Sequence, residues 1–484
     1  MIRITAISII TLFLTQLGYS QVIISNGGIL STQGQALVFL NQIDLVNNGR
    51  LDHSGTLTVL GSITNNDSFV CATNATNTVS LDQDWTNNGN YFSGDGSVVF
   101  NGANQIIEGS AVSSFYDLIL QGQIGEIKTA QISMAVKNSL ILTNSELALL
   151  TNTLTLSKAS INVTRDTGYI STDFPGKVIA NMDITSTTDI EIPLGYSIDK
   201  DDYRPFTLKA PNRGLYEFGL YGNNPSIDGF DESQLNDSIC RIQDEYYYYL
   251  KTSFAALDYT VKLTSDEDEY TKLAFWKNLE WKKLTNSKEL STTEMEASQN
   301  PNQSYFLALA VEQPFAYAGE DAIDRDGGTY VLQGDGYLTR LSFMSWSPDK
   351  DLSCSDCFKP VLTFGEGGEF VLTVDNGVGC VDRDTVEIIH LREEIFTENA
   401  FTPNNDNLND VFRPKLLTNE TLVNIQVYSR WGHKVYDGID GWDGTYMGSI
   451  APQGAYIYLL TVDQRLLRGQ KNINYSKGTL TLLR

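Results

Sequence analysis

The chain has 484 residues, and its 34 Lys and Arg against 59 Asp and Glu give a formal net charge of −25 at pH 7. Nucleic acid and anionic membrane surfaces repel so acidic a chain, so we set nucleic-acid binding aside. The 41% of hydrophobic residues suffice for several cores, and 39 Gly between short apolar runs predict an all-β protein. The length corresponds to roughly three or four domains.

Residues 1–20 have the pattern of a secretory signal peptide. Arg3 supplies a positive charge, Ile4–Leu17 is an apolar stretch, and Gly18 and Ser20 are the small residues expected before a cleavage site. A membrane anchor is the less favoured alternative, because the stretch is shorter than the ~20 residues that span a bilayer. We therefore expect export from the cytoplasm and removal of this segment.

The segment 21–182 repeats loosely. Asn47, Asn65 and Asn87 are spaced by 65 − 47 = 18 and 87 − 65 = 22 residues, and each is followed by Asn-Gly or Asn-Asp between alternating apolar residues. We expect these dipeptides to make turns through positive φ angles. Short strands at such a period predict stacked β-coils, and we interpret the segment as a right-handed parallel β-helix. A string of antiparallel hairpins is the alternative.

The segment 183–313 has longer alternating strands, for example Tyr216–Leu220, Glu245–Leu250 and Ser304–Ala310. Such strands predict an antiparallel β-sandwich. Aromatic residues on alternate strand positions usually fill a sandwich core, which is the interpretation we favour. A sugar-stacking surface is the alternative.

The segment 314–392 predicts a further sandwich, with Trp346 in its core and Phe370, Leu372 and Val374 alternating inward on a late strand. It resembles the PKD-like, Ig-type modules, and the resemblance implies a spacer or adhesive role. The pieces that carry this resemblance are Ala316–Asp321, Ser345–Pro348, Leu352–Cys357 and Glu369–Cys380.

Cys354 and Cys357 form a CxxC pair. In an exported chain without a second CxxC, we expect a disulfide rather than a redox or zinc site. Cys71, Cys240 and Cys380 are distant from one another in sequence and are left unassigned.

The segment 393–484 carries four anchors in order. They comprise Phe401, Thr402, Pro403, Asn404, Asp406, Asn409 and Asp410, then Arg430, Trp431 and Gly432, then Gly441, Trp442, Asp443 and Gly444, and finally Lys477, Gly478, Thr479 and Arg484. Their order and spacing resemble the gliding-motility-associated C-terminal domain, the type B sorting domain of the type IX secretion system of Bacteroidetes. The strand pattern predicts a small β-sandwich with Trp431 and Trp442 in its core.

The resemblance implies export across the outer membrane to the cell surface or the medium. It implies recognition by the type IX translocon and by an outer-membrane partner of the PorP/SprF type. The terminal strand with Lys477 and Arg484 is the part of the signal that we favour.

Oxygen ligands in a tight turn attract calcium, and Asn404, Asp406, Asn409 and Asp410 offer them. The alternative, which we prefer, is a network of Asx turns that stabilises the loop. The sequence predicts no other cofactor.

No nucleophile elbow, zinc-protease motif or phosphate-binding loop occurs in the chain, and it contains only 3 His. We therefore expect no enzyme, but an adhesin-like or structural protein of the cell surface. The alternative is a secreted β-helix protein that binds or cleaves polysaccharide, and a polysaccharide or another cell surface is the expected kind of ligand.

Overall fold

The computed structural model describes residues 2–4, 21–24, 26–32, 36–73, 77–157, 162–182, 189–196, 203–209, 214–252, 259–265, 269–284, 288–291, 294–299, 304–325, 329–338, 342–363 and 367–484. The all-β prediction is confirmed, since the helices in this part of the chain are the short 3₁₀ turns η1 (Pro225–Asp228) and η2 (Leu467–Gly469). No helix among these residues has the length and apolar character needed to cross a membrane. The chain divides into two compact units, Met1–Glu312 and Gln313–Arg484.

The predicted signal peptide lies almost wholly outside the described residues. Its described part is strand β1 (Ile2–Ile4), which pairs in parallel with β3 (Ile29–Thr32).

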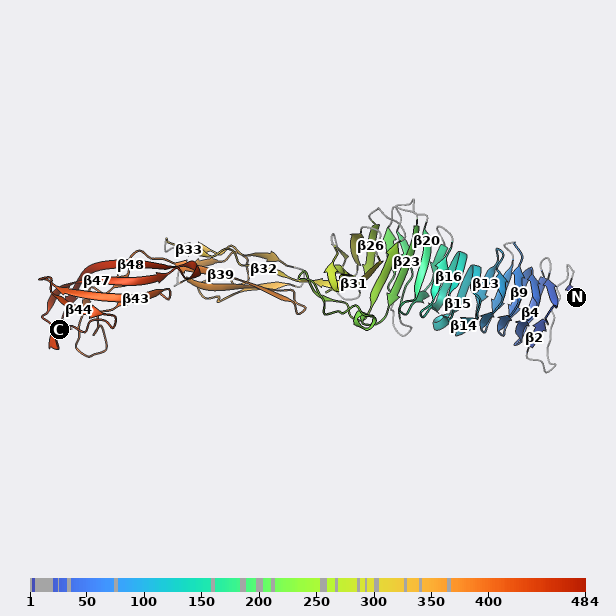
Figure 1. Cartoon of the computed structure of the whole chain (residues 1–484), viewed down its shortest axis with the longest axis horizontal. Helices are drawn as coiled ribbons and strands as arrows, with labels where there is room; N and C mark the ends of the chain where they lie inside the picture. Colours follow the sequence, from blue (N-terminus) through green and yellow to red (C-terminus); the bar gives the residue numbers. More distant parts are fainter. Residues whose placement is uncertain are drawn as a thin grey trace. The chain divides into compact units, whose positions relative to one another are not determined.

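The first unit begins with a parallel solenoid (Figure 1). One set of parallel strands is β2 (Gln21–Ile24), β5 (Asp44–Asn47), β8 (Ile63–Asn65), β11 (Trp85–Asn87) and β14 (Gln105–Glu108). A second is β3, β6 (Arg50–His53), β9 (Ser68–Cys71) and β12 (Asn90–Phe92). A third is β4 (Ala36–Leu40), β7 (Gly55–Val59), β10 (Thr78–Leu81) and β13 (Ser97–Phe100).

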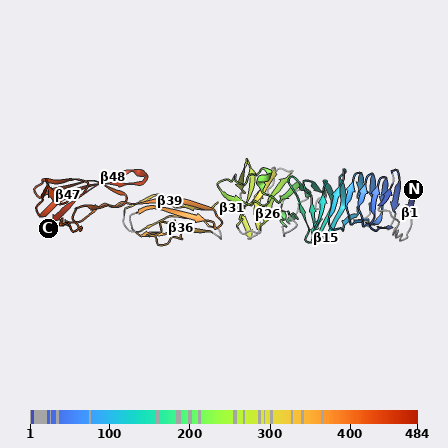
Figure 2. The same cartoon turned by 90° about the horizontal axis from the view of Figure 1, so that it is seen from below.

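Later coils use longer strands. They are β15 (Ser113–Ala130), β16 (Met134–Ala148), β17 (Thr153–Leu156), β18 (Asn162–Arg165), β19 (Tyr169–Ser171) and β20 (Lys177–Met182). β15 and β16 run side by side in parallel through two register shifts, so each bends around the coil. Figure 2 shows the same stack of coils from below. The parallel pairing excludes the hairpin alternative.

Buried and outward-facing residues alternate along the strands of the solenoid, and the buried ones fill its interior. On β7, the residues Gly55, Leu57 and Val59 point inward, while Thr56 and Thr58 face outward. Aromatic rings pack edge-on in this interior, and the Trp85 ring lies 4.9 Å from that of Tyr91 and 5.6 Å from that of Phe115. Because the residues that point inward are largely apolar, the stacked coils share one continuous core.

The repeated asparagines form two ladders rather than left-handed turns. Inside the solenoid the Asn47 amide donates to Asn65 (2.7 Å), and the Asn65 amide donates to Asn87 (2.8 Å). A second, exposed ladder joins Asn48, Asn66 and Asn88. No residue of these described turns has a positive φ, so that expectation is wrong. The glycine at 89 is needed for close stacking instead, because a Cβ there would lie 2.1 Å from the Asp67 carbonyl oxygen.

The boundary predicted at 182/183 falls inside a continuous sheet. β20 pairs in parallel with β17 on one side and antiparallel with β23 (Gly214–Tyr221) on the other. The sheet continues through β25 (Tyr247–Thr252), β31 (Ser304–Glu312), β24 (Ile239–Ile242), β27 (Lys272–Lys277) and β28 (Glu280–Lys283). A second antiparallel sheet contains β21 (Ile190–Ile192), β22 (Phe206–Lys209), β26 (Tyr259–Thr264), β30 (Glu294–Gln299) and β29 (Lys288–Ser291).

The sheet of the solenoid therefore continues beyond its last coil. The free edge of β20 forms backbone hydrogen bonds with β23, the first antiparallel strand. Aromatic residues fill this part: Tyr246, Tyr247 and Tyr248 are buried, and the ring of Phe206 lies 5.2 Å from that of Phe218. These contacts match the core interpretation of the aromatic residues.

The second unit begins with an Ig-like β-sandwich. Its main sheet is β33 (Ala322–Asp324), β39 (Val381–His390), β38 (Gly367–Asp375) and β36 (Phe343–Ser347), in that order. Two pairs complete it: β32 (Phe315–Tyr317) with β35 (Asp335–Tyr337), and β34 (Thr329–Val331) with β37 (Val361–Thr363). As expected, Trp346, Phe370, Leu372 and Val374 lie in the core.

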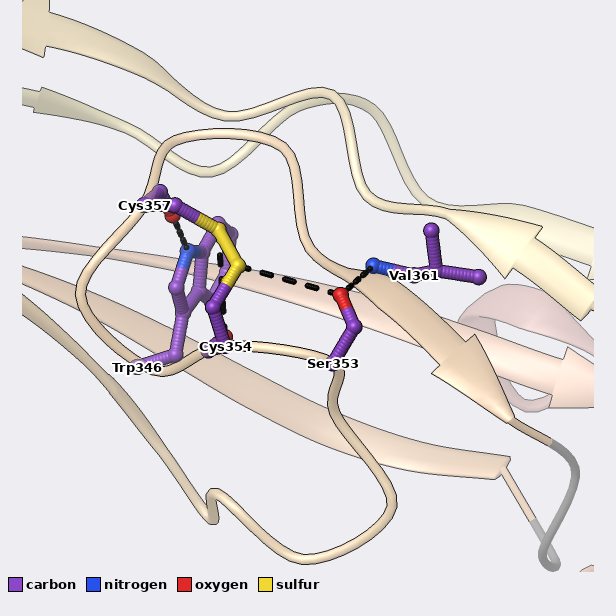
Figure 3. The surroundings of a disulfide bond; sticks show 5 residues. All are labelled: Trp346, Ser353, Cys354, Cys357 and Val361. Carbon is purple, nitrogen blue, oxygen red and sulfur yellow. Dashed lines mark hydrogen bonds between the residues drawn. A yellow bond between two sulfur atoms is a disulfide. The ribbon is translucent and has the colours of Figure 1, made fainter.

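Cys354 and Cys357 are joined by a disulfide that lies beside the Trp346 indole (Figure 3). The indole N–H donates to the Cys357 carbonyl (2.8 Å), and the Ser353 hydroxyl accepts from the Val361 N–H (2.9 Å). The bridged loop thus closes over the core tryptophan. Cys71 is a free, buried thiol.

Candidate functional site in the C-terminal domain

The residues from Ile395 to Leu482 form a second sandwich in this unit, with a core of its own. Its sheet has the order β41 (Ala400–Phe401), β48 (Lys471–Leu482), β47 (Gly454–Arg465), β43 (Glu420–Ser429) and β44 (Lys434–Gly438). Shorter pairs are β40 (Phe396–Thr397) with β42 (Pro414–Lys415), and β45 (Thr445–Tyr446) with β46 (Ser449–Ile450). The edge strand β41 pairs in parallel with the last strand, β48, at Phe401 and Leu482, so residues near both ends of the domain lie in one sheet.

Two of the four anchors contribute side chains to one core, namely Phe401 of the first and Trp442 of the third. The rings of Phe401 and Trp442 lie 5.4 Å apart, and Tyr456 packs edge-on against Trp442 at 4.6 Å. Phe412 and Trp442 exchange backbone hydrogen bonds of 2.9 and 3.2 Å. The Trp442 indole N–H donates to the Thr445 carbonyl (2.8 Å), which satisfies its polar atom within the core.

Two glycines of the anchors are required by close contacts. Gly478 faces Tyr458 across the β47–β48 ladder, and a Cβ at Gly478 would lie 2.3 Å from the Tyr458 hydroxyl oxygen. That hydroxyl also hydrogen-bonds the Thr397 hydroxyl at 2.7 Å. Gly441 has φ +90°, and a Cβ there would meet the Arg413 side chain at 2.5 Å.

The Asn-rich loop is a network of side-chain to backbone hydrogen bonds. The Asp410 carboxylate accepts from the N–H groups of Asn404 (2.8 Å), Asn405 (2.7 Å) and Asn407 (2.8 Å). Asp406 accepts from the Asn404 side-chain amide (2.8 Å) and from the Leu408 N–H (2.8 Å), and these bonds lower the pKa of Asp406.

This arrangement matches the Asx-turn alternative. Left-handed backbone at Asn405, Asn407 and Asn409 lets the loop wrap around the Asp410 carboxylate, and the Asn409 carbonyl accepts from the Thr402 N–H (2.9 Å). A calcium ion would have to displace N–H donors from both carboxylates. Calcium binding by Asn404, Asp406, Asn409 and Asp410 stays a prediction.

The expectation of two core tryptophans is wrong for Trp431. Arg430–His433 connects β43 to β44 beyond the end of the sheet, and Trp431 is 75% exposed there, whereas Trp442 is 0% exposed. The Arg430 guanidinium lies 4.9 Å from the centre of the Trp431 ring. This anchor therefore lies apart from the core that contains Phe401 and Trp442.

The terminal anchor divides between the surface and the chain end. Lys477 and Thr479 lie on the exposed face of β48. The Arg484 guanidinium donates to the Gly444 carbonyl (2.9 Å), and the Gln453 side chain donates to the Arg484 carbonyl (3.0 Å). The chain end is thus tied to the Gly441–Gly444 anchor, where Asp443 closes an Asx turn on Thr445.

The sequence did not indicate a buried ion pair between Arg392, near the start of the domain, and Glu420. Glu420 is fully buried and accepts from Arg392 (3.0 Å), from the Leu417 N–H (2.9 Å) and from Gln464 (3.1 Å). Burial would raise the pKa of Glu420, but the hydrogen bonds from Arg392, Leu417 and Gln464 outweigh it and hold this pKa below its usual range. No local pattern could reveal the pair, because its members come from distant parts of the chain.

Residues 395–482 match the CHU_C type IX secretion signal domain. No curated protein matches the chain. Solved structures similar to it include Dpr2 Ig1–Ig2 in complex with DIP-Theta Ig1–Ig3, with 10% identity, a TM-score of 0.21, and coverage of 47% of this chain and 94% of that chain. Protocadherin Gamma B2 extracellular cadherin domains 3–6 give 10% identity, a TM-score of 0.16, and coverage of 58% and 82%.

Dimeric latent PorU from Porphyromonas gingivalis gives 9% identity, a TM-score of 0.13, and coverage of 47% of this chain and 32% of that chain. With such low TM-scores, these structural likenesses carry no argument about function. The family match concerns the domain whose core is described above. Residues 395–482 are thus similar to type IX secretion signal domains, and this similarity implies export by that system.

Proposed function

We propose that this chain is an adhesin-like or structural protein that the type IX secretion system delivers to the cell surface or the medium. The observation that carries the proposal is the secretion signal domain at residues 395–482. Its match is supported by the geometry, because Phe401, Trp442 and Gly478 each have a defined place in one closed sandwich.

The remainder of the chain suits display rather than chemistry. The solenoid presents outward rows of short side chains, such as Thr56, Thr58, Thr78 and Ser80, over a largely apolar interior. Repeat architectures of this kind provide extended surfaces for binding another molecule. We assign the chain no catalytic role, and a polysaccharide or a cell surface is the ligand that the proposal expects.

The proposal includes a first step of export through the predicted signal peptide at residues 1–20. It also includes recognition by the translocon and by a PorP/SprF-type outer-membrane protein. The Ig-like sandwich at 314–392 then serves as a spacer of the PKD-like kind. These roles follow the resemblance of the sequence to sorting proteins of Bacteroidetes.

A host with a disabled type IX translocon tests the proposed route. The full-length protein is followed by fractionation in that host and in its parent, together with a periplasmic marker. The proposal expects the protein at the surface or in the medium of the parent, and in the periplasm of the disabled host. Equal release from both strains would contradict it.

The display role is tested on the secreted full-length protein. We expect it to bind a polysaccharide or whole cells in a glycan and cell-binding screen. A protein that binds neither but assembles on the surface would favour the structural role over the adhesive one. Release of shortened sugar chains would instead support the polysaccharide-cleaving alternative.

A further inference from the structure

The anchor Arg430–Gly432 has no evident place in the core of the secretion signal domain. Trp431 leaves 75% of its surface exposed, while Phe401 and Trp442 are 1% and 0% exposed. A large apolar side chain in water contributes little to folding stability. The fold therefore explains Phe401 and Trp442 but gives no reason for a tryptophan at position 431.

The turn that carries Trp431 is held in one backbone conformation. The Ser429 N–H donates to the His433 carbonyl (2.8 Å), and the Gly432 N–H donates to the Ser429 carbonyl (2.9 Å). The Ser429 hydroxyl accepts from the N–H groups of Trp431 and His433, at 3.3 Å each. Gly432 has φ +79°, a left-handed conformation that suits glycine. These bonds present the indole from a constrained turn instead of a free loop.

The charge beside the indole is not neutralised within the domain. The Arg430 guanidinium lies 4.9 Å from the Trp431 ring centre, and it makes no ion pair among the described residues. Lys434, by contrast, pairs with Asp437. A stacked guanidinium and indole together offer an apolar surface with a positive rim. Trp and Arg are the residue types that most often dominate binding energy at protein interfaces.

We propose that the Arg430–Gly432 turn is the contact through which a protein of the secretion machinery recognises this domain, with Trp431 entering an apolar pocket that carries carboxylates at its rim. The inference rests on the proposed function, because it assigns a recognition surface to the same export signal. A constrained turn loses little conformational entropy on binding. Less of the binding free energy gained by burying the indole is therefore spent on ordering the turn.

The test uses Trp431→Ala in the full-length chain and compares the exported fraction with that of the unaltered protein. We expect export to fall by about tenfold or more, as for loss of an interface hot spot. Trp431→Phe should retain part of the export, and Arg430→Ala should reduce it. The matched control is Met447→Ala, which removes an 86% exposed side chain from the β45–β46 turn and should leave export unchanged.

Folding is checked separately by thermal unfolding and protease resistance of each purified full-length variant, which should equal those of the unaltered protein. Normal export of Trp431→Ala would overturn the inference while the proposed function stands. Release of the unaltered chain from a host with a disabled translocon would overturn the proposed function itself. Binding of the protein to outer-membrane lipid vesicles that depends on Trp431, with normal export of Trp431→Ala, would assign the indole to a membrane surface and also overturn the inference.

Discussion

The solenoid and the secretion signal domain reach a closed core in opposite ways. In the solenoid, each coil pairs with the next, and Asn47, Asn65 and Asn87 repeat one interior position. In the signal domain, Phe401 pairs with Leu482, which is 482 − 401 = 81 residues away. The solenoid can therefore form coil by coil, whereas the signal domain needs its two ends together. A destabilising substitution should therefore promote unfolding of only the nearby coils in the solenoid, but unfolding of the whole signal domain.

The largest effect is expected from Trp442→Ala. It removes the indole that joins Phe401 and Tyr456, and it should destabilise the signal domain by about 3–5 kcal/mol. Hydrogen exchange along the full-length chain would measure this as faster exchange throughout β41, β43, β47 and β48. Trp431→Ala is the control, since an exposed side chain should change exchange little. Protection lost only next to Trp442 would contradict the all-or-none closure of this domain.

A smaller and more local effect is expected from Asn65→Leu in the inner ladder. It removes the acceptor of the Asn47 amide and the donor to Asn87, which should cost about 2–4 kcal/mol in the coils around it. Hydrogen exchange should rise near β5, β8 and β11, with later coils unaffected. Asn66→Ala in the exposed ladder is the matched control and should cost at most about 1 kcal/mol.

Gly478→Ala probes the close contact with Tyr458. The added methyl group must push the tyrosine hydroxyl aside, which should cost about 1–3 kcal/mol. Combining it with Tyr458→Ala should cost less than the sum of the two single changes, because the truncation removes the hydroxyl and also the ring carbons that would lie 2.6 and 2.8 Å from the new Cβ. Double-mutant unfolding measurements check this coupling, and strictly additive losses would show that the contact is not the cause.

A dependence on pH is expected from Glu420. Its folded-state pKa is lowered, so its ionised form stabilises the domain above the usual carboxyl pKa of about 4.3. This contribution is lost as the pH falls through the lower folded-state pKa. Glu420→Gln should therefore be less stable than the unaltered chain at pH 7, and the difference in unfolding free energy should shrink below about pH 4. A difference that is constant from pH 7 to pH 3 would refute the role of this carboxylate.

The sequence predicted much of the solenoid because its rule is local. The spacing of Asn47, Asn65 and Asn87 indicated stacked coils, although it could not say that the first Asn of each pair points inward. The predicted boundary at 182/183 falls within a continuous sheet, because the open edge of the solenoid at β20 pairs with the antiparallel strand β23. Nothing in the pattern of β20 distinguishes these partners.

In the signal domain, the sequence predicted the residues of the motif but not where each of them lies in the fold. Trp431 and Trp442 look alike as letters, and only the position of the β43–β44 turn separates an exposed indole from a buried one. The Glu420–Arg392 pair was missed because its members are far apart in sequence. Contacts between residues far apart in sequence determine the fold of the signal domain, whereas a short repeated pattern determines the fold of the solenoid.

The central claim is that residues 395–482 direct export. We would compare the full-length protein with a version that ends at Glu394, by surface proteolysis of intact cells and by fractionation of the medium. The account predicts that the full-length chain is accessible to protease or released, and that the truncated chain is folded but retained in the periplasm. Equal export of both forms would contradict the account and leave the C-terminal domain without a role as a signal.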